Sequence, residues 1–286
     1  MEIVNTTAVL PTGQDVKAVL RQLREAGFTR LDMGLDGYEK QVQSENYEAW
    51  AADIREEAER LGLVFSHSHA CFVPSGMTLD LPERNLRCLR CAEILGAEYM
   101  VVHPIWRKCY ADTEEESFLH GEEFIETNVQ AILPLLEPAE RHGVTLLTEN
   151  LQFGGSRYPE VITELLDRVN SPRFGWCFDT GHACTKGIDM ERLTRGRTPL
   201  SLHVHDDLGE GNDLHLSPGM GIIDWDKFLR ILRDIGYRGD FVLEASAPFC
   251  DIPDTKTQNH YLHVLYTKAH RMVQQFEGEG RMTAFL

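Results

Sequence analysis

The residues best suited to chemistry gather in one short stretch of the chain, HVHDDLGEGNDLHLSPGMGIIDW, at residues 203–225. Its first thirteen positions hold three histidines and three aspartates, namely His203, His205, Asp206, Asp207, Asp213 and His215. A solvated acidic loop would account for the aspartates but would not need the histidines. Imidazole and carboxylate groups together are typical of divalent-metal binding and of proton transfer. The stretch therefore predicts a metal site or an acid–base site.

The spacing within this stretch suggests different roles for its members. His203 and His205 are two residues apart, so on a strand they would face the same side. We expect His203 to ligate the metal directly. His205 lies where the strand ends, and it fits a position behind the metal ligands and a solvent-exposed position equally well. Asp213 and His215 repeat the spacing and are expected to form a lid or a second metal site. A solvated loop is expected for the remaining acids: Asp206, Asp207 and Glu210.

The elements that would position these residues form a repeating series. Short apolar runs alternate with longer helical patterns along the whole chain, with no linker or low-complexity segment between them. This alternation predicts a βα series with a parallel sheet. Strands are expected at residues 2–5, 30–34, 63–66, 99–102, 145–148, 174–178, 201–204 and 241–243. Eight such units predict a single α/β domain over residues 1–286, a closed (β/α)8 TIM barrel.

A TIM barrel places its active groups at the carboxyl ends of the strands. Six of the eight expected strands end at, or are followed by, a residue that can ligate a metal. These residues are His67, His69, His103, Glu149, Asp179, His182, His203 and Glu244. One buried acid or histidine is more often a packed structural residue, but residues at six equivalent places would converge on one barrel mouth.

Convergence of these groups requires charge compensation. Carboxylates and imidazoles packed together lose hydration and repel like charges unless a cation lies between them. Oxygen and nitrogen ligands without thiolate suit several divalent ions. We expect a divalent metal ion at this place, and the ligand types alone do not select between Mn²⁺, Mg²⁺, Co²⁺ and Zn²⁺.

Composition excludes several other classes of protein. Lys and Arg number 28 against 45 Asp and Glu, for a formal net charge of −17, which disfavours general binding to nucleic acids or anionic membranes. No segment approaches the roughly 18 apolar residues of a membrane span, and the start lacks the pattern of a secretory signal. A cytoplasmic location is expected, with the seven cysteines as thiols. Cys88 and Cys91 are expected to pack within a helix rather than to form a redox or zinc pair.

Seven segments carry a resemblance to a known family: HSHACF, VVHP, LLTEN, CFDTGHA, HVHDD, NDLHLSPGMGIIDW and FVLEAS. In order and approximate spacing they resemble the xylose isomerase-like TIM-barrel superfamily, which contains sugar (phosphate) isomerases and epimerases and the type IV apurinic endonucleases. The resemblance spans nearly the whole chain. For the ketose 3-epimerase branch it implies that His182 lies beside the substrate and that four residues ligate a single metal: Glu149, Asp179, His203 and Glu244.

The endonuclease branch of the same superfamily binds three zinc ions. Its ligand types can be laid onto nine residues of this chain: His69, His103, Glu149, Asp179, His182, His203, Asp213, His215 and Glu244. The mouth loops, however, contain few basic residues to neutralise DNA phosphates, the exceptions being Arg107, Lys108 and Arg157. The segment NDLHLSPGMGIIDW also resembles the isomerase and epimerase branch more closely.

We therefore expect a divalent-metal-dependent enzyme, an isomerase or epimerase of a sugar or sugar derivative in carbohydrate metabolism. Its catalytic residues would be Glu149 and Glu244, which move protons through a metal-stabilised enediolate. Substrate binding is expected from His69, His103, His182, Asp213 and His215. One alternative is a type IV apurinic endonuclease-like trinuclear zinc phosphodiesterase acting on DNA. Another is a metal-dependent lyase, or a subunit of a larger complex, on the same barrel.

The expected partner is a small-molecule sugar or sugar derivative, with neither a membrane nor a nucleic acid, and a homo-oligomer is compatible with the sequence. Four aromatic residues of the mouth loops could stack on such a molecule or pack against each other: Trp106, Phe153, Tyr158 and Phe249. The segment FGGSR, at residues 153–157, is a weak candidate for a phosphate loop and is equally consistent with a simple turn.

Overall fold

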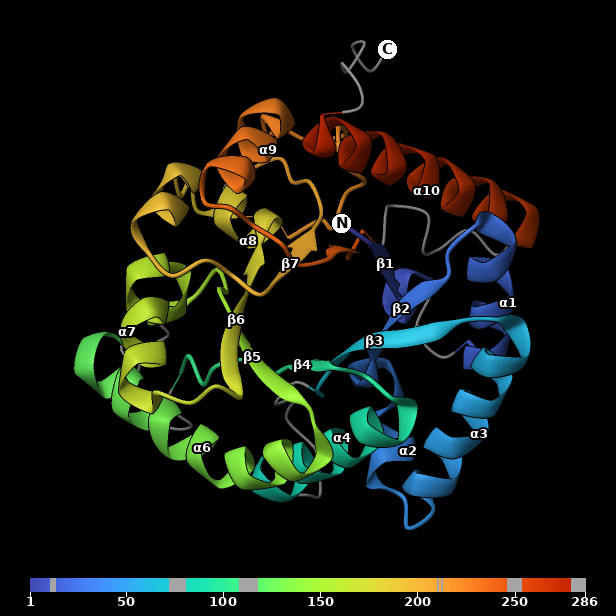
Figure 1. The fold of residues 1–286 in the computed structure, drawn as a ribbon, viewed down its shortest axis with the longest axis horizontal. Coiled ribbons are helices and arrows are strands. Elements are labelled where there is room, and N and C mark those ends of the chain that lie inside the picture. Colours follow the sequence, from blue (N-terminus) through green and yellow to red (C-terminus); the bar gives the residue numbers. More distant parts are fainter. Residues whose placement is uncertain are drawn as a thin grey trace.

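Eight parallel strands close into a barrel in the order β1 to β8, with β8 paired to β1 (Figure 1). The computed structural model describes residues 1–10, 14–71, 81–107, 118–209, 211, 213–245 and 254–278. The strands are β1 Ile3–Thr6, β2 Arg30–Gly34, β3 Val64–His69, β4 Tyr99–Val101, β5 Thr145–Glu149, β6 Phe174–Asp179, β7 Ser201–Val204 and β8 Phe241–Leu243. The (β/α)8 barrel expected from the sequence is confirmed.

Helices surround the barrel as an outer ring (Figure 1). They are α1 Val16–Ala26, α2 Glu39–Gln43, α3 Tyr47–Leu61, α4 Leu81–Leu95, α6 Gly121–His142, α7 Pro159–Val169, α8 Thr180–Thr185, α9 Trp225–Asp234 and α10 Thr255–Glu277. Short 3-10 segments are η1 Thr7–Val9, η2 Leu35–Tyr38, η3 Gly154–Arg157 and η4 Met190–Arg195. Local signals set their ends: α9, for example, begins where the Asp224 side chain accepts the Lys227 N–H, as N-cap residues do.

Strand residues alternate between two apolar environments. Outward-facing residues such as Leu31, Phe65 and Trp176 join the large core between the sheet and the helices. Inside the barrel, Val101 and Leu147 form a small separate cluster with Cys177 and Tyr99. Because side chains alternate along each strand, the next inward position beyond this cluster lies at the mouth.

The third strand extends farther than the sequence indicated. It was expected to end at residue 66, but β3 continues to His69 and pairs there with Val101 of β4. His67 consequently lies inside the barrel rather than in a mouth loop. It contacts Ser66 and Ser201 through its two ring nitrogens, and burial lowers its pKa to about 3. His67 is therefore a neutral packed histidine in the barrel interior.

The sequence predicted cysteines that remain thiols and no membrane-spanning helix. Cys88 and Cys91 are buried in α4, as expected, and the five described cysteines are free thiols. Cys109 and Cys250 lie outside the described residues. Within the described ranges, no helix combines the length and the apolar character that crossing a bilayer requires.

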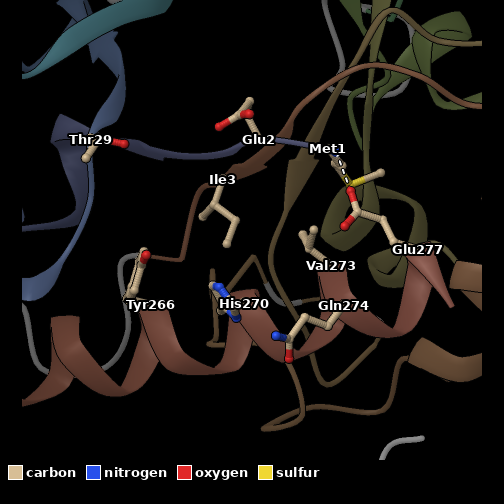
Figure 2. Close-up of a pocket in the computed structure, with 9 residues that line it drawn as sticks. All are labelled: Met1, Glu2, Ile3, Thr29, Tyr266, His270, Val273, Gln274 and Glu277. Carbon is tan, nitrogen blue, oxygen red and sulfur yellow. Dashed lines mark hydrogen bonds and ion pairs between the residues drawn. The ribbon is translucent and has the colours of Figure 1, made fainter. Parts of the chain in front are cut away.

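A cavity of about 270 Å³ lies between the start of β1 and helix α10, where the Met1 amine forms an ion pair with Glu277 (Figure 2). Its lining residues are Met1, Glu2, Ile3, Thr29, Tyr266, His270, Val273, Gln274 and Glu277. It lies at the amino end of the strands and contains none of the predicted site residues. The candidate chemistry is at the opposite end of the barrel.

Candidate metal centre

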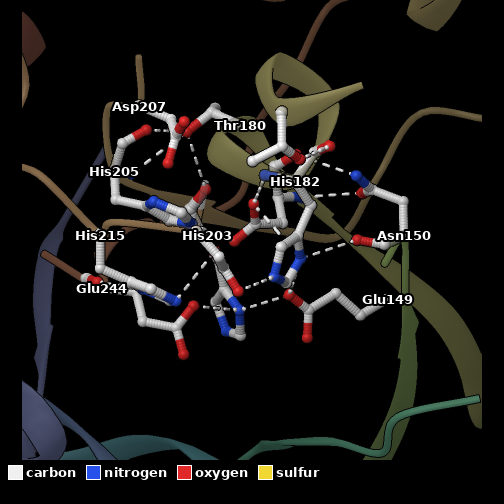
Figure 3. Close-up of polar contacts among 12 residues, drawn as sticks. Glu149, Asn150, Thr180, His182, His203, His205, Asp207, His215 and Glu244 are labelled. Carbon is white, nitrogen blue, oxygen red and sulfur yellow. Dashed lines mark hydrogen bonds and ion pairs between the residues drawn. The ribbon is translucent and has the colours of Figure 1, made fainter. Parts of the chain in front are cut away.

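The mouth of the barrel brings together four residues that offer ligand atoms within 4.8 Å of one another: Glu149, Asp179, His203 and Glu244. We call them the inner group. Glu149 and Asp179 end β5 and β6, His203 lies in β7, and Glu244 follows β8. His203 Nδ1 is 3.1 Å from Glu149 Oε1 and 3.0 Å from Glu244 Oε2. Figure 3 shows the two carboxylates on either side of this imidazole.

Two further histidines approach the other oxygen of Glu149. His69 Nε2 lies 3.4 Å and His103 Nε2 3.2 Å from Glu149 Oε2. His69, His103 and Glu149 offer ligand atoms within the same 4.8 Å limit. Ring nitrogen Nδ1 of His69 is 2.9 Å from the Ala70 carbonyl oxygen, so Nε2 is the nitrogen that faces Glu149. Glu149 thus belongs to two potential ligand sets.

A third set, which we call the outer group, consists of His182, His205, Asp213 and His215. Asp213 lies between two imidazoles, with Oδ2 3.7 Å from His182 Nε2 and Oδ1 3.4 Å from His215 Nε2. His215 adopts a left-handed backbone conformation, with φ of 47°, and its Nδ1 is 2.8 Å from the Glu244 carbonyl oxygen. His205, whose place the sequence left open, is fully buried.

The segment that carries Asp213 and His215 is anchored by Asp206 and Asp207. The sequence suggested a solvated loop for both, and this was wrong, because each residue is fully buried. The Asp206 carboxylate accepts the backbone N–H groups of Asp207, Gly219 and Ile223 and the indole N–H of Trp225. Asp207 accepts the N–H groups of Gly209 and Leu214. Glu210 lies outside the described residues.

The electrostatics of the inner group show that its carboxylates need positive charge. Burial would raise the pKa of the Glu149 carboxyl, but the charge of His203 and hydrogen bonds from surrounding imidazoles hold that pKa well below its usual value. Burial would likewise lower the pKa of His203, yet nearby groups, including Glu244 and Glu149, raise it well above the ordinary value. Protons on the imidazoles supply charge that a divalent cation can replace. The donor set therefore fits a metal ion.

Two site residues were not found from the sequence. Asn150 accepts the Asp179 N–H through Oδ1 at 2.8 Å and donates from Nδ2 to the Asp179 carbonyl at 2.9 Å; its position directly after Glu149 was the available signal. Asp32 lies on β2, where no site residue was expected. It is 1% exposed, its Oδ1 has no hydrogen-bond partner among the described residues, and burial raises its pKa to about 6.

The aromatic residues of the mouth loops pack mainly against each other. The rings of Trp106 and Phe153 stack with centroids 4.5 Å apart, and Phe118 adjoins both. Tyr158 lies under the guanidinium groups of Arg157 and Arg192. Phe249 and Lys108 are outside the described residues.

The glycine-rich segment that was a weak phosphate-loop candidate forms the turn η3. A Cβ atom on Gly154 would lie 2.7 Å from the Leu119 carbonyl oxygen and 2.9 Å from that of Trp106. This close approach to backbone, at a φ of +56°, explains the glycine by packing.

Comparison with known proteins places the chain in a family. The chain belongs to the xylose isomerase-like TIM barrel family, whose model matches residues 15–260. Solved structures share the fold. One is an IolI protein with a bound zinc atom, which is 18% identical with a TM-score of 0.73; the match covers 96% of this chain and 99% of that chain. A D-allulose 3-epimerase from Methylomonas sp., also at 18% identity, has a TM-score of 0.72 and covers 96% and 98%.

Two relatives detected by sequence match different shares of the chain. An uncharacterized protein of Methanocaldococcus jannaschii is 27% identical over 212 residues, 68% of each chain. A probable endonuclease 4 of Mesomycoplasma hyopneumoniae is 28% identical over 156 residues, which are 49% of this chain and 52% of that protein.

We expect Asp206→Asn to lower the free energy of unfolding by roughly 2–3 kcal/mol, because buried donors lose a charged acceptor and meet an amide N–H2 instead. Urea unfolding followed by circular dichroism measures the change. Asp234→Asn, on the exposed face of α9, is the matched control and should change stability by less than about 0.5 kcal/mol. Equal unfolding midpoints for the two variants would contradict the anchoring role of Asp206.

Proposed function

We propose that this protein is a divalent-metal-dependent isomerase or epimerase of a sugar or sugar derivative. The observation that carries the proposal is the arrangement of Glu149 and Glu244, which come from strands β5 and β8 and meet the same nitrogen of His203 from either side. Proton transfer between two positions of a sugar needs two acid–base groups near one polarising centre. The inner group provides this combination at the barrel mouth.

The inner group would hold the metal through Glu149, Asp179, His203 and Glu244. When bound, a divalent ion there polarises a carbonyl or hydroxyl of the substrate and so acidifies the neighbouring C–H bond. Manganese is the expected ion, and the protein is expected to work in the cytoplasm.

Glu149 and Glu244 would carry the proton. Burial would raise both pKa values, but the charge of His203 holds them below the usual range, which favours the ionised form that accepts a proton. One carboxylate removes the proton from carbon to give a planar enediolate. The other carboxyl group, once it has taken a proton from a neighbouring imidazole or from solvent, returns a proton to the opposite face of the same carbon, which epimerises the sugar. Return of the abstracted proton to the adjacent carbon isomerises it instead.

The remaining mouth residues would bind the hydroxyl groups of the substrate. His69 and His103 approach Oε2 of Glu149, and His182, Asp213 and His215 belong to the outer group. Imidazoles and carboxylates offer both donors and acceptors, as a polyhydroxylated ligand requires. The shared fold with a D-allulose 3-epimerase supports a sugar as the class of substrate.

A trinuclear zinc phosphodiesterase acting on DNA is the second candidate, favoured by the same clusters. The ligand sets at the mouth together contain all nine residues that the endonuclease branch would use, and a probable endonuclease 4 is among the relatives. Against this candidate stands the net charge of −17, because DNA binding depends on cationic contacts to phosphates. We therefore favour a sugar substrate. A lyase reaction would use the same inner group and is distinguished by its products.

We expect Glu149→Gln and Glu244→Gln each to lower kcat by at least about 100-fold, because each variant loses a charged ligand and a proton carrier while it keeps the side-chain volume. Turnover is measured by NMR on a panel of ketoses, keto-sugars and inositol derivatives, with circular dichroism as the check on folding. Gln152→Ala, which removes an exposed contact to Asp213, is the control and should retain most activity. Near-wild-type turnover in either glutamine variant with full metal occupancy would refute the assigned role.

Turnover in D2O should introduce deuterium at the carbon beside the carbonyl, because the carboxylate that holds the abstracted proton exchanges it with solvent. Mass spectrometry and NMR of the product measure the label. Partial labelling is compatible with a shielded base. Unlabelled product combined with efficient cleavage of abasic-site DNA would instead support the phosphodiesterase.

A further inference from the structure

His205 is a fully buried imidazole that belongs to the outer group and also contacts the inner group. Its Nε2 lies 3.0 Å from Asp179 Oδ2. Its ring stacks on the ring of His215, with centroids 4.0 Å apart and planes 10° from parallel. Figure 3 shows the ring beside those of His203 and His215. None of the roles proposed above uses this contact with Asp179.

Among the described residues, the other contacts of the Asp179 carboxylate are all made through Oδ1. Its Oδ1 accepts the His182 N–H at 2.6 Å. The Asn150 side chain bonds to both the backbone N–H and the backbone carbonyl of Asp179. Neither contact involves Oδ2, whose polar partner is His205. A carboxylate oxygen has two lone-pair directions, and the Nε2–H of His205 takes one of them and leaves the other for a cation.

The surroundings of His205 hold its ring in this position. Its backbone N–H donates to Thr180 Oγ1 at 3.1 Å, and its carbonyl accepts the Thr180 hydroxyl at 2.7 Å. A Cβ atom on Gly181 would lie 1.9 Å from His205 Cε1, so the ring fills space that any other residue at position 181 would occupy. His205 Nδ1 has no hydrogen-bond partner among the described residues. The contact with Asp179 is therefore the ring's polar anchor.

We propose that His205 is a positioning residue for the inner metal site, which orients Asp179 by donating a hydrogen bond to Oδ2. The inference rests on the inner group as the metal site of the proposed function and adds a residue to it. Partners that orient metal ligands typically contribute about 10- to 100-fold in metal affinity. His205 also explains why Gly181 follows the ligand strand, since the imidazole must pass over that position to reach Asp179.

Two variants separate the hydrogen bond from the ring. His205→Phe keeps a flat ring to stack on His215 but has no donor, whereas His205→Gln keeps an N–H donor at the place of Nε2 without a ring. With Co²⁺ titrated into metal-free protein, we expect His205→Phe to bind about 10- to 100-fold more weakly and to change the visible absorption bands of the bound ion. His205→Gln should stay close to the wild-type affinity and spectrum. His67→Gln, at a buried histidine bonded to serines, is the control and should bind as the wild type does.

Wild-type affinity for Co²⁺ and an unchanged spectrum in His205→Phe would overturn the proposal. Equally weakened Co²⁺ binding in His205→Phe and His205→Gln would also overturn it, because the effect would then come from packing of the ring. If His205→Phe fails to fold, His205→Asn replaces it, because its shorter amide cannot reach Asp179; the same weakening is expected, and wild-type affinity overturns the proposal. Failure of the proposed function is distinguishable: wild-type protein that binds Co²⁺ but converts no sugar contradicts the function alone. Wild-type protein that binds no Co²⁺ contradicts both.

Discussion

The buried carboxylate of Glu149 meets imidazoles on both of its oxygens, and the arrangement of the mouth follows from the need to compensate its charge. His69 and His103 approach Oε2, and His182 and His203 approach Oε1, all within 3.4 Å. A carboxylate taken out of water is unfavourable unless positive charge faces it. Protons shared with imidazoles offset that charge, and in the proposed function a divalent ion would offset it. The same groups can therefore serve as metal ligands and as proton carriers.

The barrel delivers these groups through its register. Asp179 of β6 pairs with His203 of β7, and Glu149 of β5 pairs with Cys177 of β6. The inward-facing residues of neighbouring strands therefore lie at defined levels along the barrel axis. The apolar residues Val101, Leu147 and Cys177 close the barrel beneath them. Parallel strands end on the same side of a barrel. Ligands separated by many residues in sequence thereby meet within a few ångströms.

The sequence predicted the fold and which side chains meet at the barrel mouth, because both leave periodic signals. Strand-to-helix alternation indicated eight βα units, and ligand types at strand ends indicated the mouth. Whether the residues brought together act as proposed remains a prediction. What the sequence missed was decided by tertiary contacts: Asp206 looks like a solvated acid, but its donors include Gly219 and Trp225, more than ten residues away. The alternating polar residues of β3 likewise resembled a loop, because a strand with polar residues facing a barrel interior lacks the usual apolar signal.

The number of metal ions per chain tests most directly whether the inner group is the functional site. Elemental analysis after dialysis against a weak chelator gives this number for the wild-type protein and for a double variant with Asp213→Asn and His215→Ala. Our account predicts about one ion per chain, retained in the double variant, because four inner ligands complete one site while Asp213 and His215 serve the substrate. Three zinc ions per chain, falling when the outer pair is removed, would contradict it and would assign the histidines of the mouth to a metal cluster.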